Sequence, residues 1–550
     1  MWSILFSALL FPCVSKVFNL TIKYDVIVVG SGPAGVSSAY PLLKAGLSVL
    51  MVDGGNQPIS KPPTLDFLSW RTTDHRQSDL IIGNNFYSLK SLNGGSPKLR
   101  IPGFEYVFKD YLEFNRIENK GYSITGSLAA GGLSNAWGSG VACLSQAELE
   151  NFPFPSSELN LSYESIARRI GLSGRSHDDL QIYHGVDMWA KAPIQIDSIH
   201  EYLFAKYQKK MSKNLDAQFS MGRTRLATLS ENLADRKACS LCGNCLWGCS
   251  SGSIYSAADE ISNLKSYENF RYLPGFRVQE IIPNLKLPVI EGIHLKDGVH
   301  QRFEAGKIFL AAGTIASSGL AFKALNLFKE VSILSCPTAA FMVWVPRFLG
   351  KPREVGFGSG QLAFRLRLDM GNLHAYGATF STLGIPVSEF LSKVPMRAPF
   401  GLTMLRNLLS SCIVGNLFLP GNLGGGKIQL TEKGALVVRH EPNSEVKGLT
   451  KEAKSILARG YRKIGGVLLP GSFTIGNPGG DIHYAGTMPM RMNPSRGETD
   501  RNGELIGLAG VHVVDGACLP ILTEKPHTFT IMANADRIGR YVADEFQLQK

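Results

Sequence analysis

The sequence predicts an α/β protein: a sheet of parallel strands layered with helices, joined to a second part of the α+β type with an antiparallel sheet. Residues 24–29 form a short β-branched run that ends at a glycine, a helical pattern follows at 36–44, and a second apolar strand follows at 47–52. Such a strand–helix–strand unit favours parallel strands. Residues 363–368 alternate apolar and basic side chains, which is typical of an antiparallel strand with one solvated face.

The chain is long enough for two domains, because 550 residues exceed what one hydrophobic core usually supports. We expect an apolar extension, then a parallel-sheet domain that is interrupted by a second domain and completed at the C-terminus; the expected segments are 1–23, 24–325, 326–474 and 475–550. Shorter elements are also predicted: irregular loops and a lid at 55–120, a helix at 163–170, a strand at 307–310, and a hairpin of 427–430 with 435–438.

Charge and cysteine content narrow the class of partner. The net charge of +12 favours anionic partners such as phosphorylated substrates, glycans or a lipid surface, but the basic residues are dispersed, so nucleic acid is not expected. The nine cysteines are not spaced as a secreted disulfide framework, which favours a reducing compartment, the cytoplasm. The apolar segment of residues 1–11 is too short to span a bilayer, so no transmembrane helix is expected there. Export of the protein or its association with a membrane surface through this segment is left open.

A glycine motif joins the first strand to the first helix. Gly30, Gly32 and Gly35, with Pro33 and Ala34 between them, form G-x-G-x-x-G. The first glycine permits the tight turn, the second lets the backbone approach a pyrophosphate, and the third allows close helix–strand packing. Asp53 ends the next strand, where a carboxylate can accept hydrogen bonds from ribose hydroxyls. The unit therefore predicts a dinucleotide site, for FAD or NAD.

Three C-terminal segments resemble the signature of the glucose–methanol–choline (GMC) oxidoreductases: 483–487, 513–517 with Pro520, and 526–533. The glycine motif and two further segments, 131–138 and 311–315, fit the same family in the same order. The resemblance implies a GMC-type fold, with a Rossmann-like FAD-binding domain and an α+β substrate domain. It also implies FAD as the cofactor and an alcohol as the donor of a hydride to flavin N5.

The resemblance further implies roles for individual residues. His483 and His527 correspond to the family's active-site pair, in which one imidazole takes the hydroxyl proton and its partner stabilises the developing alkoxide. The remaining cofactor contacts that it implies, beyond the glycine motif and Asp53, are Gly132, Ser134, Asn135, Trp137, Val278, Ala312, Gly313, Asp515, Gly516 and Thr528. Which histidine is the principal base is left open.

Four cysteines fall within eleven residues: Cys239, Cys242, Cys245 and Cys249 have the spacing C-x2-C-x2-C-x3-C. Thiolates at this spacing can hold an iron–sulfur cluster, and four thiolates can also hold a tetrahedral zinc ion. Some GMC members carry a similar stretch near the flavin, which is equally compatible with an unliganded structural loop. An iron–sulfur cluster beside FAD would suit one-electron exit to an acceptor protein.

The leading interpretation is an FAD-dependent enzyme that oxidises a primary or secondary alcohol, such as that of a carbohydrate or glycoconjugate. Its partners are then a small-molecule alcohol or sugar and an electron acceptor, which is a protein, a quinone or O₂. Two alternatives remain: an oxidase that returns electrons to O₂, and a non-catalytic electron-transfer flavoprotein. The presence of both histidines favours catalysis.

Overall fold

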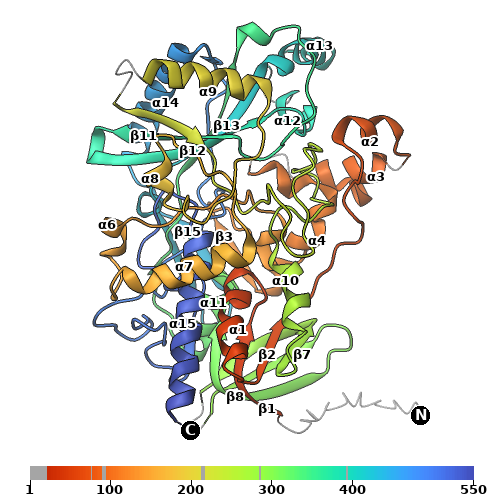
Figure 1. The fold of residues 1–550 in the computed structure, drawn as a ribbon. Coiled ribbons are helices and arrows are strands. Elements are labelled where there is room, and N and C mark those ends of the chain that lie inside the picture. Colours follow the sequence, from red (N-terminus) through yellow and green to blue (C-terminus); the bar gives the residue numbers. More distant parts are fainter. Residues whose placement is uncertain are drawn as a thin grey trace, which may run out of the picture.

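The computed structural model describes residues 22–549 apart from 76, 90–94, 212–216, 284–286, 392–393 and 395. Residues 1–21, most of the predicted apolar extension, lie outside the described part. Two sheets are stacked along the long axis of the molecule, one at each end, with irregular segments between them (Figure 1).

The first sheet is the predicted parallel sheet. Its strand order is β5-β2-β1-β8-β7-β6, with β18 beside β8. The strands are β1 (Ile22–Val29), β2 (Val49–Asp53), β5 (Phe270–Pro274), β6 (Phe276–Ile282), β7 (Val289–His294), β8 (His300–Leu310) and β18 (Val511–Val513). Strands β1, β2, β5, β8 and β18 are parallel, whereas β6 and β7 are antiparallel additions. The carboxyl ends of the parallel strands therefore meet at one edge, where ligands bind in sheets of this kind.

Helices from distant parts of the chain cover the first sheet (Figure 1). They are α1 (Pro33–Lys44), α7 (Ser157–Ile170), α10 (Ala257–Leu264), α11 (Thr314–Leu325) and α15 (Thr528–Leu548). Helix α15 lies so close to α1 that a Cβ at Gly539 would meet the backbone of Ser38. The C-terminal segment thus packs on the first sheet through β18 and α15.

The second sheet is antiparallel, in the order β16-β10-β13-β12-β11-β4 with β17 beside β10. The strands are β4 (Phe219–Arg223), β10 (Thr338–Trp344), β11 (Leu362–Leu368), β12 (Leu373–Ser381), β13 (Cys412–Phe418), β16 (Val467–Leu468) and β17 (Thr474–Ile475). Helices α9 (Ser198–Met211) and α14 (Glu445–Ile464) pack against it and share one apolar core with it. Two short helices, α12 (Val387–Leu391) and α13 (Ala398–Leu408), follow β12.

The predicted hairpin forms, but it belongs to a third sheet. Strands β14 (Gly426–Leu430) and β15 (Leu436–His440) pair with β9 (Val331–Ser332) and β3 (Ile117–Lys120). Ile428 and Val438 of the hairpin pack in the core of the parallel-sheet domain. In the other direction, β4 and α9 join the second sheet from before residue 326, so the sheets do not follow the expected boundaries strand by strand. The boundaries themselves stay predictions.

Several elements are longer than the sequence pattern indicated. The first helix begins at Pro33 instead of 36, because proline suits the first helical position, where its missing N–H is not needed. Helix α7 begins at Ser157, and β8 begins at His300. The segment 55–120 was expected to be irregular, yet it contains the short helices α2 (Phe67–Thr73), α3 (Gln77–Ile81), α4 (Glu105–Phe108) and α5 (Tyr111–Phe114).

Candidate active site

A single large cavity runs from the carboxyl edge of the parallel sheet to the antiparallel sheet. Its volume is about 1620 Å³, above the roughly 300–1,000 Å³ usual for one ligand, so it has room for a cofactor together with a substrate. Most of the predicted cofactor contacts lie in its wall, namely Gly30, Gly32, Pro33, Ala34, Asp53, Gly132, Ser134, Trp137, Val278, Ala312, Gly313, Asp515, Gly516 and Thr528. Gly35 and Asn135 are not part of that wall.

The glycine loop has the shape of a phosphate cradle. Gly30 has φ +106°, and a Cβ there would meet the backbone of Ala311, so the crossing of two loops requires glycine. Glycine is also needed at position 35 for packing, since a Cβ added there would meet the carbonyl of Gly30. By contrast, a Cβ at Gly32 would have nothing within 4 Å. Helix α1 starts there without a side-chain cap, which leaves its first N–H groups available to an anion.

Two carboxylates border the cofactor end of the cavity, the half-buried Asp53 and the buried Asp515. Asp53 accepts hydrogen bonds from Ser31 and from Tyr272 Oη at 2.9 Å, and burial raises its pKa to about 6. Asp515 accepts from the Gly313 N–H at 2.8 Å and also has a pKa raised by burial to about 6. Asp515 therefore joins the turn after β8 to the turn after β18, and its contact with a cofactor stays a prediction.

The loop 131–137 is held by its own side chains. Asn135 Nδ2 donates to the carbonyls of Ala130 and Gly132 at 2.9 and 2.8 Å, which explains why it faces away from the cavity. Trp137 Nε1 donates to the Tyr255 carbonyl at 2.8 Å. The loop thus presents Gly132 and Ser134 to the cavity in a fixed conformation.

The two predicted catalytic histidines come together from separate segments. The imidazole rings of His483 and His527 lie 4.7 Å apart between centroids, at 70° to each other, and both line the cavity. Burial lowers the pKa of His483 to about 4, and burial together with the neighbouring His483 lowers the pKa of His527 well below its usual value. Both rings are therefore neutral at pH 7. Each has a buried Nδ1 with no hydrogen-bond partner among the residues that the structure describes.

A buried carboxylate that the sequence analysis missed lies beside His483. Asp481 Oδ2 is 3.9 Å from His483 Nδ1 and accepts hydrogen bonds from the N–H groups of His483 and Cys336. Oδ1 accepts from Ser335 Oγ at 2.7 Å, and burial raises the Asp481 pKa to about 7. Ile482 between them has φ +64°, a strained value for a β-branched residue. The carboxylate therefore clamps a strained turn that aims His483.

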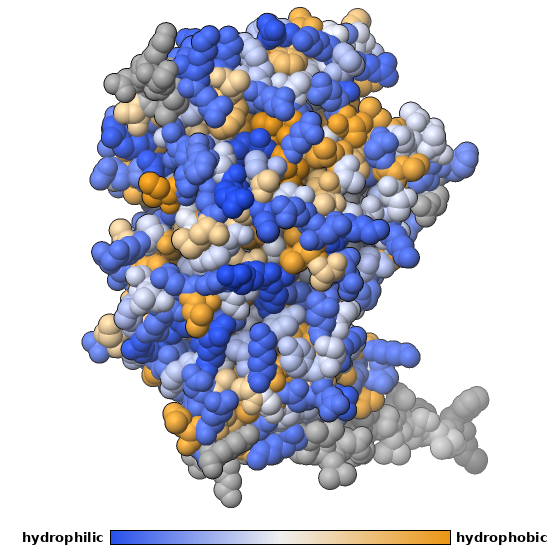
Figure 2. Space-filling model, in the orientation of Figure 1, coloured by the Kyte–Doolittle hydropathy of each residue, from blue (hydrophilic) through white to orange (hydrophobic). Residues whose placement is uncertain are grey.

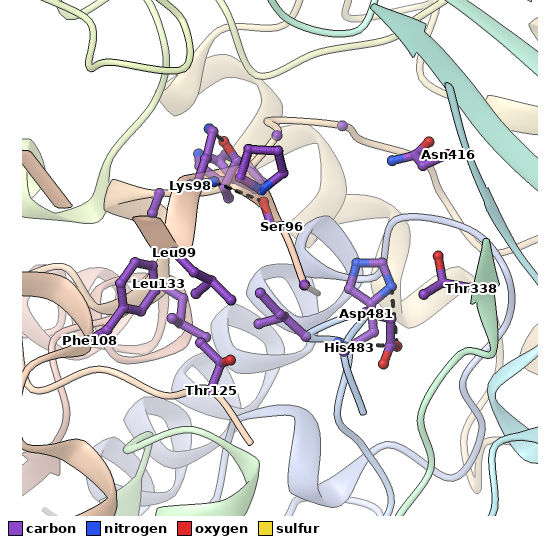
Figure 3. A pocket seen from close by; sticks show the side chains of 18 of the residues that line it. Ser96, Lys98, Leu99, Phe108, Thr125, Leu133, Thr338, Asn416, Asp481 and His483 are labelled. Carbon is purple, nitrogen blue, oxygen red and sulfur yellow. Dashed lines mark hydrogen bonds and ion pairs between the residues drawn. The ribbon is translucent and has the colours of Figure 1, made fainter. Parts of the chain in front are cut away.

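Further residues reach His483 from the antiparallel sheet. Phe418, at the end of β13, packs on the imidazole with 4.9 Å between ring centroids. Figure 3 shows Thr338 and Asn416 on the same side of the cavity as His483 and Asp481, while Lys98 and Leu99 lie across from them. In the sequence, Asp481 could have been noticed because it lies two residues before the motif histidine His483. Phe418, Thr338 and Asn416 have no such sequence signal.

Comparisons with known proteins agree with this geometry. A family model described as GMC oxidoreductase matches residues 477–535, the segment that contains both histidines, and a model described as FAD binding domain matches residues 23–72. In these two segments the chain is similar to the GMC oxidoreductases and to FAD-binding domains. No curated protein sequence matches it.

Solved structures share the fold of this chain over almost its whole length. Formate oxidase from Aspergillus oryzae RIB40 is 12% identical with a TM-score of 0.62, covering 96% of this chain and 99% of that one. Pyridoxine 4-oxidase from Mesorbium loti is 14% identical with a TM-score of 0.60, covering 94% and 99%. At such identities the likeness establishes the fold, a parallel Rossmann-like sheet plus an antiparallel substrate sheet, and not the substrate. Within the described residues, no helix combines the length and apolar composition needed to cross a bilayer.

Cys239, Cys242, Cys245 and Cys249 surround one small cavity. Cys245 lies in the wall of both this cavity and the large one. Within the described residues, the only three ligand atoms that all lie within 4.8 Å of one another belong to Cys336, Asp481 and His483. No three of the four thiol sulfurs lie as close together as the roughly 3.8 Å that a zinc ion with bonds of about 2.3 Å would impose.

Proposed function

We propose that this protein oxidises a primary or secondary alcohol to a carbonyl compound with FAD as the hydride acceptor. The observation that carries the proposal is the pair of neutral, half-buried imidazoles of His483 and His527 in the cavity that begins at the glycine loop. Support for FAD comes from the match over residues 23–72 and from the open space above Gly32. The glycine loop and Asp53 would hold its adenosine and phosphates.

The residues of the chain then divide the proton chemistry between them. When bound, FAD supplies an acceptor for the hydride that leaves the carbon. One neutral imidazole takes the hydroxyl proton, and the second donates a hydrogen bond to the substrate oxygen as it becomes a carbonyl. An imidazole with a lowered pKa is a weak base on its own. The Asp481 carboxylate, 3.9 Å from His483 Nδ1, offsets this weakness by stabilising the imidazolium.

Substitution of each histidine tests the proposal. His483→Ala and His527→Ala should retain FAD but slow anaerobic flavin reduction by a panel of primary and secondary alcohols, by roughly 10²–10⁴-fold for the base. His440→Ala is a matched control, because His440 is half-buried and lies outside the cavity. If both variants reduce their flavin at the wild-type rate, or if no alcohol reduces the wild-type flavin, the assignment is wrong. Admission of air to the reduced enzyme then separates an oxidase, which forms peroxide, from a dehydrogenase.

We further propose that Cys239, Cys242, Cys245 and Cys249 hold an iron–sulfur cluster. Cys245 supports this because it reaches the flavin cavity, so the group would supply a one-electron route to an acceptor protein. Burial raises the pKa of Cys249, but hydrogen bonds from Ser251 and Ser253 outweigh burial and leave its pKa below the usual value. Burial raises the pKa of Cys239 to about 11 and that of Cys245 to about 12, so these two thiols would be deprotonated only by coordination to the cluster itself. The cytoplasmic location proposed from the cysteine content would keep such thiols reduced.

A further inference from the structure

The cavity extends beyond the histidines into an apolar passage between the antiparallel sheet and helices α12 and α13. Its wall there is formed by side chains that also pack together as one apolar cluster: Met342, Ile385, Phe390, Met404, Leu405 and Val414. Among the residues that the structure describes, the charged side chains in this part of the wall are Arg100 and Glu389, which bind each other with Arg100 Nε 2.7 Å from Glu389 Oε1. The pair therefore presents no net charge to a ligand.

The passage opens among exposed apolar side chains. Met396 lines the cavity and is 55% exposed, and Phe400 at the start of α13 is 69% exposed. Figure 2 shows a patch of apolar side chains on this face, at the level of α12 and toward the lobe that carries α2 and α3. Leu65 and Leu68 of that lobe are 52% and 43% exposed. A gathering of exposed apolar side chains at a cavity mouth is unusual for a soluble surface and marks a place where an apolar ligand enters.

The polar groups of the site are concentrated at the other end. His483 and His527 are there, with Thr338 and Asn416 on the same side (Figure 3). A hydroxyl bound at this end would be hydrogen-bonded, whereas further hydroxyls in the passage would be buried among Phe, Leu and Met side chains without partners, which disfavours a polar chain. Burial of methylenes along the same wall is favourable, by about fourfold in binding per methylene.

We propose that the alcohol oxidised at His483 and His527 is carried on a long apolar tail, such as an alkyl, acyl or prenyl chain, and that this tail lies between the antiparallel sheet and helices α12 and α13. The inference rests on the proposed alcohol oxidation and adds the substrate class. It is compatible with a polar group near the reacting hydroxyl, provided that the remainder of the substrate is apolar.

A chain-length series tests the tail. Anaerobic flavin reduction of the FAD-bound protein is measured with unbranched primary alcohols from ethanol to dodecan-1-ol, and with methyl glucoside as a polar donor. The ratio kcat/KM should rise about fourfold per added methylene over several methylenes before it levels off. A flat series, or a preference for methyl glucoside over dodecan-1-ol, overturns the tail and leaves alcohol oxidation standing.

A variant of the passage gives a second test. Met404→Gln keeps the length of the side chain but places an amide in the wall, so the kcat/KM of dodecan-1-ol relative to ethanol should fall about tenfold. Met370→Gln, at a half-exposed methionine outside the cavity, should leave this ratio unchanged. If no alcohol reduces the flavin, the proposed function fails. Binding still decides the tail in that case: a saturable change of the flavin spectrum by dodecan-1-ol that Met404→Gln weakens supports the passage, and no change refutes it.

Discussion

Asp481→Asn tests whether the carboxylate beside His483 assists proton transfer. Asparagine fits the site without loss of hydrogen bonds: its Oδ1 can accept from the N–H groups of Cys336 and His483, and its Nδ2 can donate to Ser335 Oγ, which rotates its own proton away. The fold, the strained turn and FAD binding should therefore persist. What disappears is the negative charge 3.9 Å from His483 Nδ1.

The size of the effect follows from that distance. Two unit charges 3.9 Å apart attract by about 4 kcal/mol at an effective dielectric constant near 20. Because 1.36 kcal/mol corresponds to a factor of ten in rate, the loss is at most about 10³-fold in flavin reduction. We expect a decrease of about 10–10³-fold, since only part of the charge has formed in the transition state.

The pH dependence gives a signature that a structural role would not produce. Because burial raises the pKa of Asp481 to about 7, the carboxylate becomes ionised as pH rises from 6 to 8, and the wild-type rate of flavin reduction should rise over this range. The asparagine variant should lack this rise. Stopped-flow reduction by a primary alcohol, measured from pH 5 to 9, checks both points.

Asp536→Asn is the matched control. Asp536 is also buried and also accepts from a serine hydroxyl, that of Ser162, but it does not line the cavity. Its substitution should leave rate and pH profile unchanged. An Asp481→Asn enzyme with the wild-type rate and the wild-type pH profile would refute the role of the carboxylate.

Two further predictions concern the cofactors. Gly32→Val should give protein without FAD, because the new side chain projects into open space where the pyrophosphate would lie. Gly356→Val, which is equally unhindered but lies outside the cavity, should still bind FAD and stay yellow. Absorbance at the flavin bands and the bound FAD content distinguish the two variants. Protein produced anaerobically should contain iron and sulfide, and Cys242→Ser should lose both, keep FAD, and slow electron transfer to a one-electron acceptor without slowing flavin reduction. Wild-type protein without iron would leave the unliganded thiol loop as the interpretation.

The first strand–helix–strand unit could be predicted from the sequence because its determinants are local. The β-branched run, the glycine turn and the following helix lie within one short segment, and Gly30 and Gly35 are required by contacts made inside that unit or with the next strand exit. His483 and His527 could be predicted for the same reason, since each lies within its own short sequence signature.

Strand pairing over long separations could not be predicted in this way. Strand β4 pairs with β11 across about 140 residues, and the hairpin of β14 and β15 pairs with β3 and β9 instead of the second sheet. Each of these strands has the same alternating pattern whichever neighbour it takes, so the pattern cannot identify its partner. Likewise Phe418 reaches His483 only because β13 ends beside it.

The apolar character of the cavity and the chemistry at its end depend on each other. Burial shifts the pKa of His483 down and that of Asp481 up, so each group alone resists its charged form. When both are charged, as after proton transfer from a substrate hydroxyl, the opposite charges 3.9 Å apart attract each other and offset part of the desolvation of each. An apolar substrate tail that fills the passage excludes water and lowers the local dielectric constant, which strengthens this attraction. A substrate that left water in the passage would weaken the attraction between the two charges. Desolvation thus opposes the protonation of His483 alone, and the Asp481 charge is what makes proton uptake favourable in the dry cavity that an apolar tail would create.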